Sequence, residues 1–539
     1  MPFTLQDSGG NLWQFAADSS GRMVSTSLGA GTAPALFLND ILTSSSWQLG
    51  VTTSGQITST AVAAGAFPVQ IALSLGYFLR INSSGIFVTL LVAVASGPQP
   101  YSYTTLGTAR QELANRLYDP TQTFWSAAEL NAYLAEALRT WNALTSYWRA
   151  EFLLTPQQGV TWYDLAQVPN SIRPYTVTDA SLYLPMQYHL LEPATGINPW
   201  AGSAQFAADD FLNAVSRRRD ELLSTAGCTI SRRVVPAVAG RTVLPDTVID
   251  IRRVAYLPAV GSPSTLWPED TWGEMAFQPR YLQLPAGTPD TYLQTTQPPI
   301  SFDTNRPPGS AGSYELLTVE AGIPLSAATP STLNIPDDWT PTIKWGALAD
   351  LLSRESNAKD SVRAQYCEAR YRMGLRLLGG ASALLALRIG NVPVQIDSIR
   401  AADNYAATWQ GQTPGPPTAA YYAGLNLVAL APAPDAGAYS ATATVIENTP
   451  IPTSDASLMQ MGRDDYDAML DYAQHLAAFK MGGSEFLATM PLFQRFMKQA
   501  SVYSSKLAEV AEYTSAILGL ASREKDMNPI TTPTEDASA

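Results

Sequence analysis

Apolar and polar positions alternate along three similar segments within residues 1–97. Each segment leads to a glycine (Gly21, Gly55 or Gly85) and carries an aromatic residue eight positions before it. These aromatic residues are Trp13, Trp47 and Tyr77. A period of two places every second side chain on one face of a strand, so each segment predicts a β-hairpin that turns at its glycine. One hairpin cannot bury its own apolar face, and we therefore expect the three to form an all-β repeat domain.

The three aromatic residues allow two interpretations. Exposed rings would stack on sugars, which would make residues 1–97 a carbohydrate-binding or fibre-docking domain. Aliphatic residues share the strand face with Trp13, Trp47 and Tyr77, however, and this favours a packed core. Gly97-Pro98-Gln99-Pro100 then predicts a linker.

From Thr104 onward the apolar period changes to 3.6 residues. Ser126 and Glu129 have the spacing of a capping box and begin a helix predicted over 126–148. A similar pattern predicts a second helix over 206–225. A sequence pattern typical of β-strands follows each helix. We expect Ala180–His189 to be an edge strand, because Pro185 fits an edge better than a sheet centre.

Two further pairs of helices are predicted, each after a run of strands. The first pair follows Thr340-Pro341 and ends near residue 378, and the second runs from Tyr466 to about residue 520. The chain therefore reads as two copies of one module, in which a leading helix and an antiparallel sheet precede a closing helical hairpin. Both leading helices come before either closing pair, so we expect the copies to interleave.

Composition narrows the classes of function. The chain has 539 residues with 33 basic and 46 acidic side chains, a net charge of −13. This balance argues against a protein that coats duplex DNA, which needs clustered cations. The two cysteines, Cys228 and Cys367, are too few for a disulfide framework, and with two histidines they nearly exclude a zinc site. We expect neither a metal nor another cofactor.

The chain also lacks the common catalytic motifs, and we expect it not to be an enzyme. His189 and His475 are interpreted as packed imidazoles rather than bases. Three acidic pairs lie at predicted helix starts, where negative charge meets the positive end of the helix dipole; they are Asp209-Asp210, Asp337-Asp338 and Asp464-Asp465. A structural role is favoured for them over a hydrolytic one. The run Arg217-Arg218-Arg219 is either a solvated face or a contact for an acidic neighbouring subunit, and contact with phosphate is the third alternative.

The body of the chain, about residues 104–522, resembles the head-to-tail adaptor proteins of tailed bacteriophages, the tail tubular protein A class. Three segments carry the resemblance: a helix that ends near Asp119-Pro120, the cap Trp125-Ser-Ala-Ala-Glu-Leu130 before a long helix, and Ile335-Pro-Asp-Asp-Trp339 before Trp345–Leu352. The module is doubled here, and residues 1–97 lie outside the resemblance. The fold class expected for the whole chain is α+β, an N-terminal all-β repeat domain followed by a duplicated helix–antiparallel sheet–helical hairpin body.

The domains expected on this basis are a β-hairpin repeat domain (1–97), an adaptor body with both leading helices, a sheet and the first closing hairpin (104–390), a second sheet and closing hairpin (391–522), and a flexible tail (523–539). The resemblance implies a structural virion protein in the neck and tail, made in the cytoplasm of a host bacterium. It would form a ring of about twelve copies under the portal ring. It would contact the tail nozzle or tube and possible tail fibres, and packaged DNA would pass through without sequence-specific binding.

By the same analogy, the two leading helices face the portal. Arg139, Arg217, Arg218 and Arg219 would then contact the portal or a neighbouring copy. Two other hypotheses stay open at this point. One is a tail protein for fibre docking or carbohydrate binding, led by Trp13, Trp47 and Tyr77. The other is a hydrolase that uses the acidic pairs.

Overall fold

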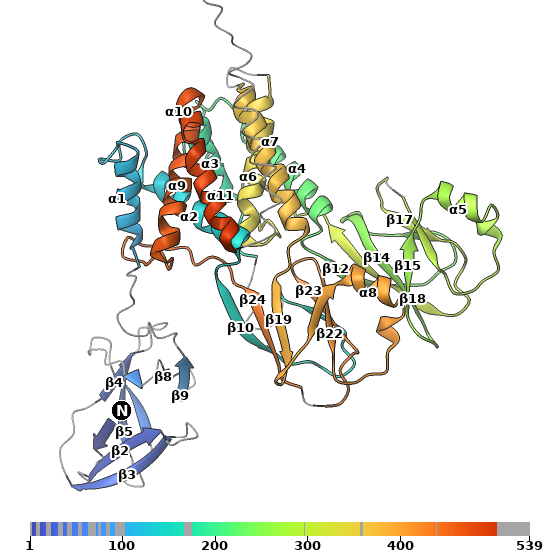
Figure 1. Ribbon diagram of the computed structural model, residues 1–539, viewed down its shortest axis with the longest axis horizontal. Helices are drawn as coiled ribbons and strands as arrows, with labels where there is room; N and C mark the ends of the chain where they lie inside the picture. Colours follow the sequence, from blue (N-terminus) through green and yellow to red (C-terminus); the bar gives the residue numbers. More distant parts are fainter. Residues whose placement is uncertain are drawn as a thin grey trace, which may run out of the picture. The chain divides into compact units, whose positions relative to one another are not determined.

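The computed structural model describes the strands of residues 1–102 and, after them, residues 103–166, 175–295, 297–355, 359–437 and 439–503. The chain divides into two compact units, Met1–Ser102 and Tyr103–Ala539 (Figure 1). It contains helices and mainly antiparallel sheets, so the predicted α+β class is confirmed. The predicted tail and the last helix beyond Tyr503 lie outside the described residues. No described helix is both long and apolar enough to cross a membrane.

The first unit contains three antiparallel sheets of three strands each. Their strands are β1 (Phe3–Gln6), β2 (Asn11–Ala17) and β3 (Met23–Ala30); β4 (Leu36–Asn39), β5 (Ser46–Val51) and β6 (Ile57–Val62); and β7 (Ala72–Leu73), β8 (Tyr77–Ile81) and β9 (Phe87–Leu91). The predicted hairpins are confirmed. Their innermost pairs are equivalent, with Ala17 opposite Met23, Val51 opposite Ile57 and Ile81 opposite Phe87.

Each repeat also has a third strand that the sequence pattern did not predict. It precedes the hairpin and pairs with the hairpin's first strand. In every repeat a leucine of this strand is the partner of the conspicuous aromatic position: Leu5 opposite Trp13, Leu38 opposite Trp47 and Leu73 opposite Tyr77. The repeat is therefore a three-stranded unit with an aromatic–leucine pair at a fixed register position.

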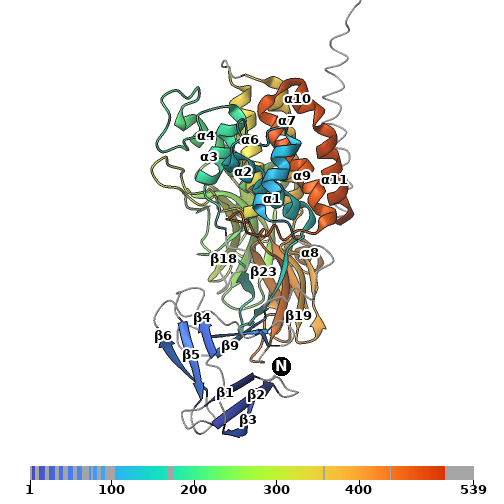
Figure 2. The same ribbon diagram turned by 90° about the vertical axis from the view of Figure 1, so that its left-hand side faces the viewer.

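The helices of the second unit are α1 (Leu106–Arg116), α2 (Ala127–Thr145), α3 (Ala180–Leu190), α4 (Ala208–Ala226), α5 (Thr271–Phe277), α6 (Thr340–Ser353), α7 (Ser361–Gly379), α8 (Ile399–Tyr405), α9 (Arg463–Ala478), α10 (Gly483–Ala488) and α11 (Met490–Tyr503). All but α5 and α8 gather in one layer above the sheets (Figures 1 and 2). A large apolar core fills this layer, with Trp141, Tyr133, Trp345 and Tyr371 among its fully buried side chains.

Two four-stranded sheets pack face to face beneath the helices. One has the order β10 (Arg149–Leu154), β24 (Ala441–Ile446), β19 (Leu384–Ile389), β20 (Val392–Pro393), and the other β11 (Trp162–Asp164), β23 (Leu427–Ala431), β22 (Ala419–Ala423), β21 (Gln395–Ser398). Alternate side chains such as Leu154, Leu387, Val428 and Leu430 form a separate apolar core between them. The second sheet therefore takes strands from both sides of residues 165–380.

A seven-stranded sheet lies on the other side of the β11 sheet. Its order is β12 (Ser231–Pro236), β18 (Gly312–Glu320), β14 (Val248–Pro258), β15 (Ser264–Pro268), β16 (Thr291–Gln294), β17 (Ser301–Thr304), β13 (Thr242–Val243). It has its own apolar core, which includes Tyr256, Phe302 and Tyr314. Figure 1 shows the three sheets in sequence across the molecule, with β10 at one side and α5 at the other.

The two sets of elements are nested in the chain. Helix α2 packs on α9 and α11, while α4 packs on α6 and α7. Strands β10 and β11 pair with β24 and β23, and the paired residues are 263 to 297 positions apart in the chain. We call residues 175–380 the inserted part, and residues 103–166 and 381–503 the enclosing part. The inserted part is complete before the enclosing part resumes, so the two sets nest rather than interleave.

The predicted edge strand at Ala180–His189 is wrong, because these residues form helix α3. Leu182, Tyr183, Met186 and His189 are buried and recur at intervals of one, three and three residues, which is a helical face. Pro185 suggested a strand edge, but tertiary packing holds it inside the helix despite the hydrogen bond that proline cannot donate.

Candidate functional site

Asp337 and Asp338, the acidic pair before α6, lie in a short 3-10 turn (Asp337–Trp339) between the helices and the sheets. Asp337 Oδ1 accepts hydrogen bonds from the backbone N–H groups of Thr176 and Val177 at 2.8 and 3.0 Å. Asp338 Oδ2 accepts one from Asn142 Nδ2 of α2 at 2.8 Å, and its Oδ1 accepts one from the Thr449 hydroxyl at 2.5 Å. Both carboxylates are buried and accept hydrogen bonds from other segments of the chain, so they hold these segments together.

The other acidic pairs also lie in first helical turns, as predicted. Asp210 accepts a hydrogen bond from the Ala207 N–H at the start of α4, at 2.9 Å. Asp465 accepts hydrogen bonds from Gln499 and Tyr503 of α11 at 3.2 and 2.8 Å. Each acidic pair therefore includes a carboxylate that accepts hydrogen bonds from within the fold, which is consistent with a structural role. Among the described residues, no group of three His, Cys, Asp or Glu side chains is placed to hold a metal ion.

The three arginines of α4 differ in their surroundings. Arg218 is buried and bonds Asp350 of α6, with Glu221 and Glu368 close by at 3.1 and 2.9 Å. These carboxylates raise the pKa of Arg218 against the effect of its burial.

Arg219 is only 1% exposed and donates to the Ile323 carbonyl at 2.7 Å. Arg217 has a mostly exposed side chain, and its Nε lies 3.1 Å from the same Asp350. The run is therefore neither a solvated face nor an open contact surface, since two of its three members are inside the fold.

Arg139 on α2 is half-buried, and it makes no ion pair with any residue that the structure describes. It therefore remains a candidate for contact with another protein. Trp13, Trp47 and Tyr77 occupy equivalent strand positions in the first unit. Their side chains lie outside the described part of the chain.

His189 belongs to a buried ionic cluster that was not predicted from the sequence. Lys344 Nζ lies 2.5 Å from Glu136 Oε2 and 2.9 Å from His189 Nε2. Burial, together with the positive charge of Lys344, holds the pKa of His189 well below its usual value, so the imidazole is neutral. The three side chains come from α6, α2 and α3, and each is at most 7% exposed. A substrate could reach them only if these helices separated.

His475 lies in an aromatic cluster around a second buried cation. Its Nε2 is 2.7 Å from the Tyr366 hydroxyl, and burial lowers its pKa to about 3. Arg370 bonds the hydroxyls of Tyr366 and Tyr472 at 2.9 and 2.6 Å. The faces of four rings surround its guanidinium: Trp345, Tyr366, Tyr472 and Phe493. This cluster joins α6 and α7 to α9 and α11.

A third buried cluster links the β11 sheet to the seven-stranded sheet. Arg253 of β14 donates to Asp403 of α8, from Nε at 2.8 Å and from Nη2 at 3.0 Å. Asp403 also accepts from the Trp409 indole, and Glu315 of β18 accepts from the Trp162 indole at 3.1 Å. The charges are paired and hydrogen-bonded, as a buried ionic group must be.

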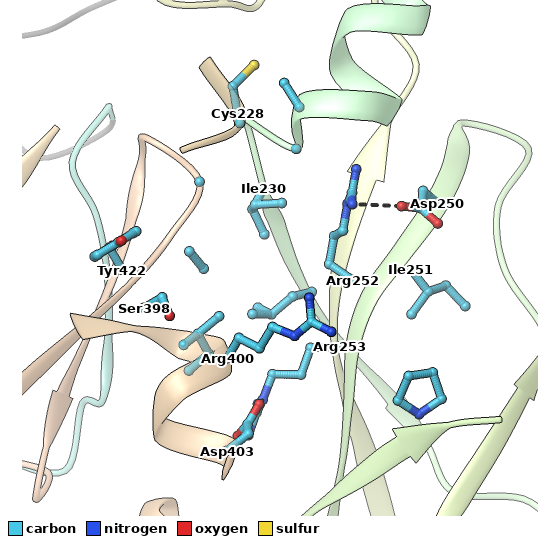
Figure 3. A pocket seen from close by; sticks show the side chains of 18 of the residues that line it. Cys228, Ile230, Asp250, Ile251, Arg252, Arg253, Ser398, Arg400, Asp403 and Tyr422 are labelled. Carbon is cyan, nitrogen blue, oxygen red and sulfur yellow. Dashed lines mark hydrogen bonds and ion pairs between the residues drawn. The ribbon is translucent and has the colours of Figure 1, made fainter. Parts of the chain in front are cut away.

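A pocket of about 570 Å³ opens beside this cluster (Figure 3). The ends of α4 and α7, strands β14 to β16, helix α8 and the β22–β23 turn line it. Arg252 is paired there with Asp250 at 2.9 Å. Arg400 is exposed, reaches from α8 toward Arg253, and has no partner among the described residues. Cys228 also lines the pocket, where burial raises the pKa of its thiol to about 12 and so keeps it protonated.

The sequence carried a signal for some of these residues. Lys344 stands between Ile343 and Trp345, and Glu136 between two alanines, so each interrupts an apolar helical stripe. A charge at such a position predicts a buried ion pair. Arg253, Asp403 and Arg400 gave no such signal.

No protein-family model and no curated protein sequence matches this chain.

Proposed function

We propose that this chain is a structural protein of a tailed-bacteriophage virion, a duplicated head-to-tail adaptor that forms a ring under the portal. The ring would join the capsid to the tail and would form part of the DNA channel. The protein would have no catalytic role and would act in the virion neck, beside the portal and the tail nozzle or tube.

The nested architecture carries this proposal. A leading helix, a sheet and a closing pair of helices occur twice: α2 with the face-to-face sheets and α9–α11, and α4 with the seven-stranded sheet and α6–α7. This is the order of elements that the resemblance to adaptors implies for one module. The proposal follows from two such modules in a single chain.

The position of the buried ion pairs supports a mechanical role. The buried ion pairs connect the inserted part to the enclosing part: Lys344 to Glu136 and Arg253 to Asp403. Asp338 bridges the same two parts through hydrogen bonds to Asn142 and Thr449. These buried ionisable side chains are thus occupied in holding the two parts together. A subunit that transmits force through a neck needs this kind of internal connection.

Electron microscopy of the virions that carry this chain would test the proposal. Antibody fragments raised against residues 103–503 should label a ring at the neck, between capsid and tail. Label that is absent from the particles, with the chain recovered only as a free monomer, would refute it.

The repeat in the first unit favours a second candidate function, fibre docking or carbohydrate binding. Three aromatic–leucine pairs recur at one register position, which would offer three equivalent binding sites if the rings face outward. Pull-down of tail fibres and glycan arrays, both with the full chain and with a chain lacking residues 1–102, would test it. Equal results for the two chains would count against this role.

A further inference from the structure

The pocket beside Arg253 contains a positive charge, that of Arg400, which no acidic residue in the described part of the chain balances. Arg253 is matched by Asp403 and Glu315, and Arg252 by Asp250. Arg400 is exposed at the pocket and has no acidic partner among the described residues. Figure 3 shows its side chain directed into the pocket rather than away from it. The guanidinium group of an arginine presents a planar fork of N–H donors that suits a carboxylate.

The rest of the lining favours a ligand with an apolar portion beside its negative charge. Ile230, Ile251 and Leu425 contribute to the walls. Trp267 and Tyr422 add aromatic surface that is partly open to solvent. A protein segment with an acidic and an aliphatic side chain on one face meets both requirements.

Such a segment lies across the two face-to-face sheets from the pocket. Strand β10 is an edge strand of the outermost sheet, where it pairs only with β24. Its alternate residues Arg149, Glu151 and Leu153 are exposed, while Phe152 and Leu154 pack on the core between the sheets. Leu153 is 73% exposed, and Glu151 has no partner among the described residues. Glu151 and Leu153 are two residues apart and so share one face of the strand.

We infer that Glu151 of one copy of this chain binds Arg400 of the next copy, with Leu153 against the apolar wall of the pocket. Charge complementarity supports the pairing, since an unbalanced cation faces an unbalanced carboxylate. Position supports it too. The β11 sheet and the core between the sheets separate the β10 face from the pocket, and Figure 1 shows β10 on the outer side of the two face-to-face sheets and α8 between these sheets and the seven-stranded sheet. A ring needs a head-to-tail interface made by two different patches of the same chain.

This inference rests on the proposed ring and adds the surfaces that close it. The test uses the full chain, supplied to virions by genetic complementation. Arg400→Glu and Glu151→Arg should each lower the number of copies in the neck at least about tenfold, because like charges then face each other at the interface. The double variant should recover most of the copies. Lys498→Glu is the matched control: Lys498 is exposed on α11, away from both patches, and this variant should assemble as the unchanged chain does.

Crosslinking provides a second readout on the same particles. A chain with both Glu151→Cys and Arg400→Cys should give a ladder of multimers with a short bismaleimide, and each single-cysteine variant should not. The native Cys228 and Cys367 are buried and serve as background in every variant.

The outcomes separate the two proposals. Absence of the unchanged chain from the neck would refute the proposed function and this interface with it. A neck ring that assembles with Arg400→Glu and gives no ladder would refute the interface alone. Loss of assembly in both single variants without recovery in the double variant, and without a ladder, would also refute it.

Discussion

Asp338 accepts a hydrogen bond of 2.8 Å from Asn142, although the two residues are 196 positions apart in the chain. Asn142 lies near the end of α2 in the enclosing part, and Asp338 lies in the 3-10 turn before α6 in the inserted part. Thr449, which follows β24, donates to the same carboxylate. One acidic side chain thus fixes the end of a leading helix, the start of a closing helix and the exit of a sheet.

Replacement of Asp338 by alanine should lower the free energy of unfolding by about 2 to 4 kcal/mol, because buried donors of Asn142 and Thr449 lose their acceptor. Urea unfolding followed by circular dichroism would measure the change. Asp246→Ala is the matched control, since Asp246 is exposed and should shift the midpoint little. Equal midpoints for the two variants would contradict the bridging role.

The Lys344–Glu136 pair allows a sharper test through a double-mutant cycle. Either Lys344→Met or Glu136→Leu alone should cost about 3 to 5 kcal/mol of stability, because each leaves one buried charge without its counter-ion. The double variant should cost less than either single variant, since no unpaired charge remains. Thermal unfolding of the four proteins would check this. Additive losses would show that the two charges do not interact.

The starts of the helices could be predicted from sequence, whereas their long-range partners could not. The Ser126 hydroxyl caps α2 as its spacing predicts, accepting from the Glu129 N–H at 3.2 Å. The Glu129 carboxylate does not complete the capping box, however. It accepts from Tyr133 and from Lys480, which is 351 residues away. Local spacing identifies a cap, but it carries no information about a partner brought in by the tertiary fold.

The same limit explains the arginine run of α4 and the helix α3. Three adjacent arginines predict an exposed cluster, because isolated charges are rarely buried. Asp350 of α6 lies next to Arg218 in space, and this allows Arg218 to be buried. For α3, the strand prediction gave Pro185 more weight than the helical spacing of the apolar residues. Tertiary packing keeps the segment helical despite the proline. The pocket beside Arg253 could not be predicted from the sequence either, since it forms where the two parts of the chain meet.

The arginine run yields a prediction with an internal control. Arg218→Ala should destabilise the fold by about 2 to 3 kcal/mol, because it removes the buried partner of the half-buried Asp350. Arg217→Ala should change stability by less than about 0.5 kcal/mol, since its side chain is mostly exposed. Melting temperatures of both variants would decide. A larger effect at Arg217 would mean that the exposed arginine, rather than the buried one, holds α4 to α6.

The first unit should be dispensable for the folding of the second. The chain separates into two compact units between Ser102 and Tyr103, and each has its own sheets. A chain of residues 103–539 should therefore melt within about 2 °C of the corresponding transition of the full chain. Differential scanning calorimetry would show one transition lost and the other retained. Loss of both transitions would indicate that the second unit depends on the first.

Stability should fall below neutral pH because both histidines are buried in neutral form. Burial lowers the pKa of His475 to about 3, and it holds the pKa of His189 well below the value of an unfolded chain. Between pH 6.5 and about 3 the unfolded state therefore binds a proton at His475 that the folded state excludes. The contribution of His475 to stability is fully present above pH 6.5, and it should fall by about 2 kcal/mol from pH 7 to pH 5. The buried His189 adds a loss of the same sign.

Urea unfolding at both pH values would measure this loss. His475→Gln should lower stability at pH 7, because the contacts of the ring with Tyr366 and Thr489 are lost. It should also reduce the loss between pH 7 and pH 5 by about 2 kcal/mol, since glutamine does not titrate. A variant as acid-sensitive as the unchanged chain would show that His475 is not the group that titrates on unfolding.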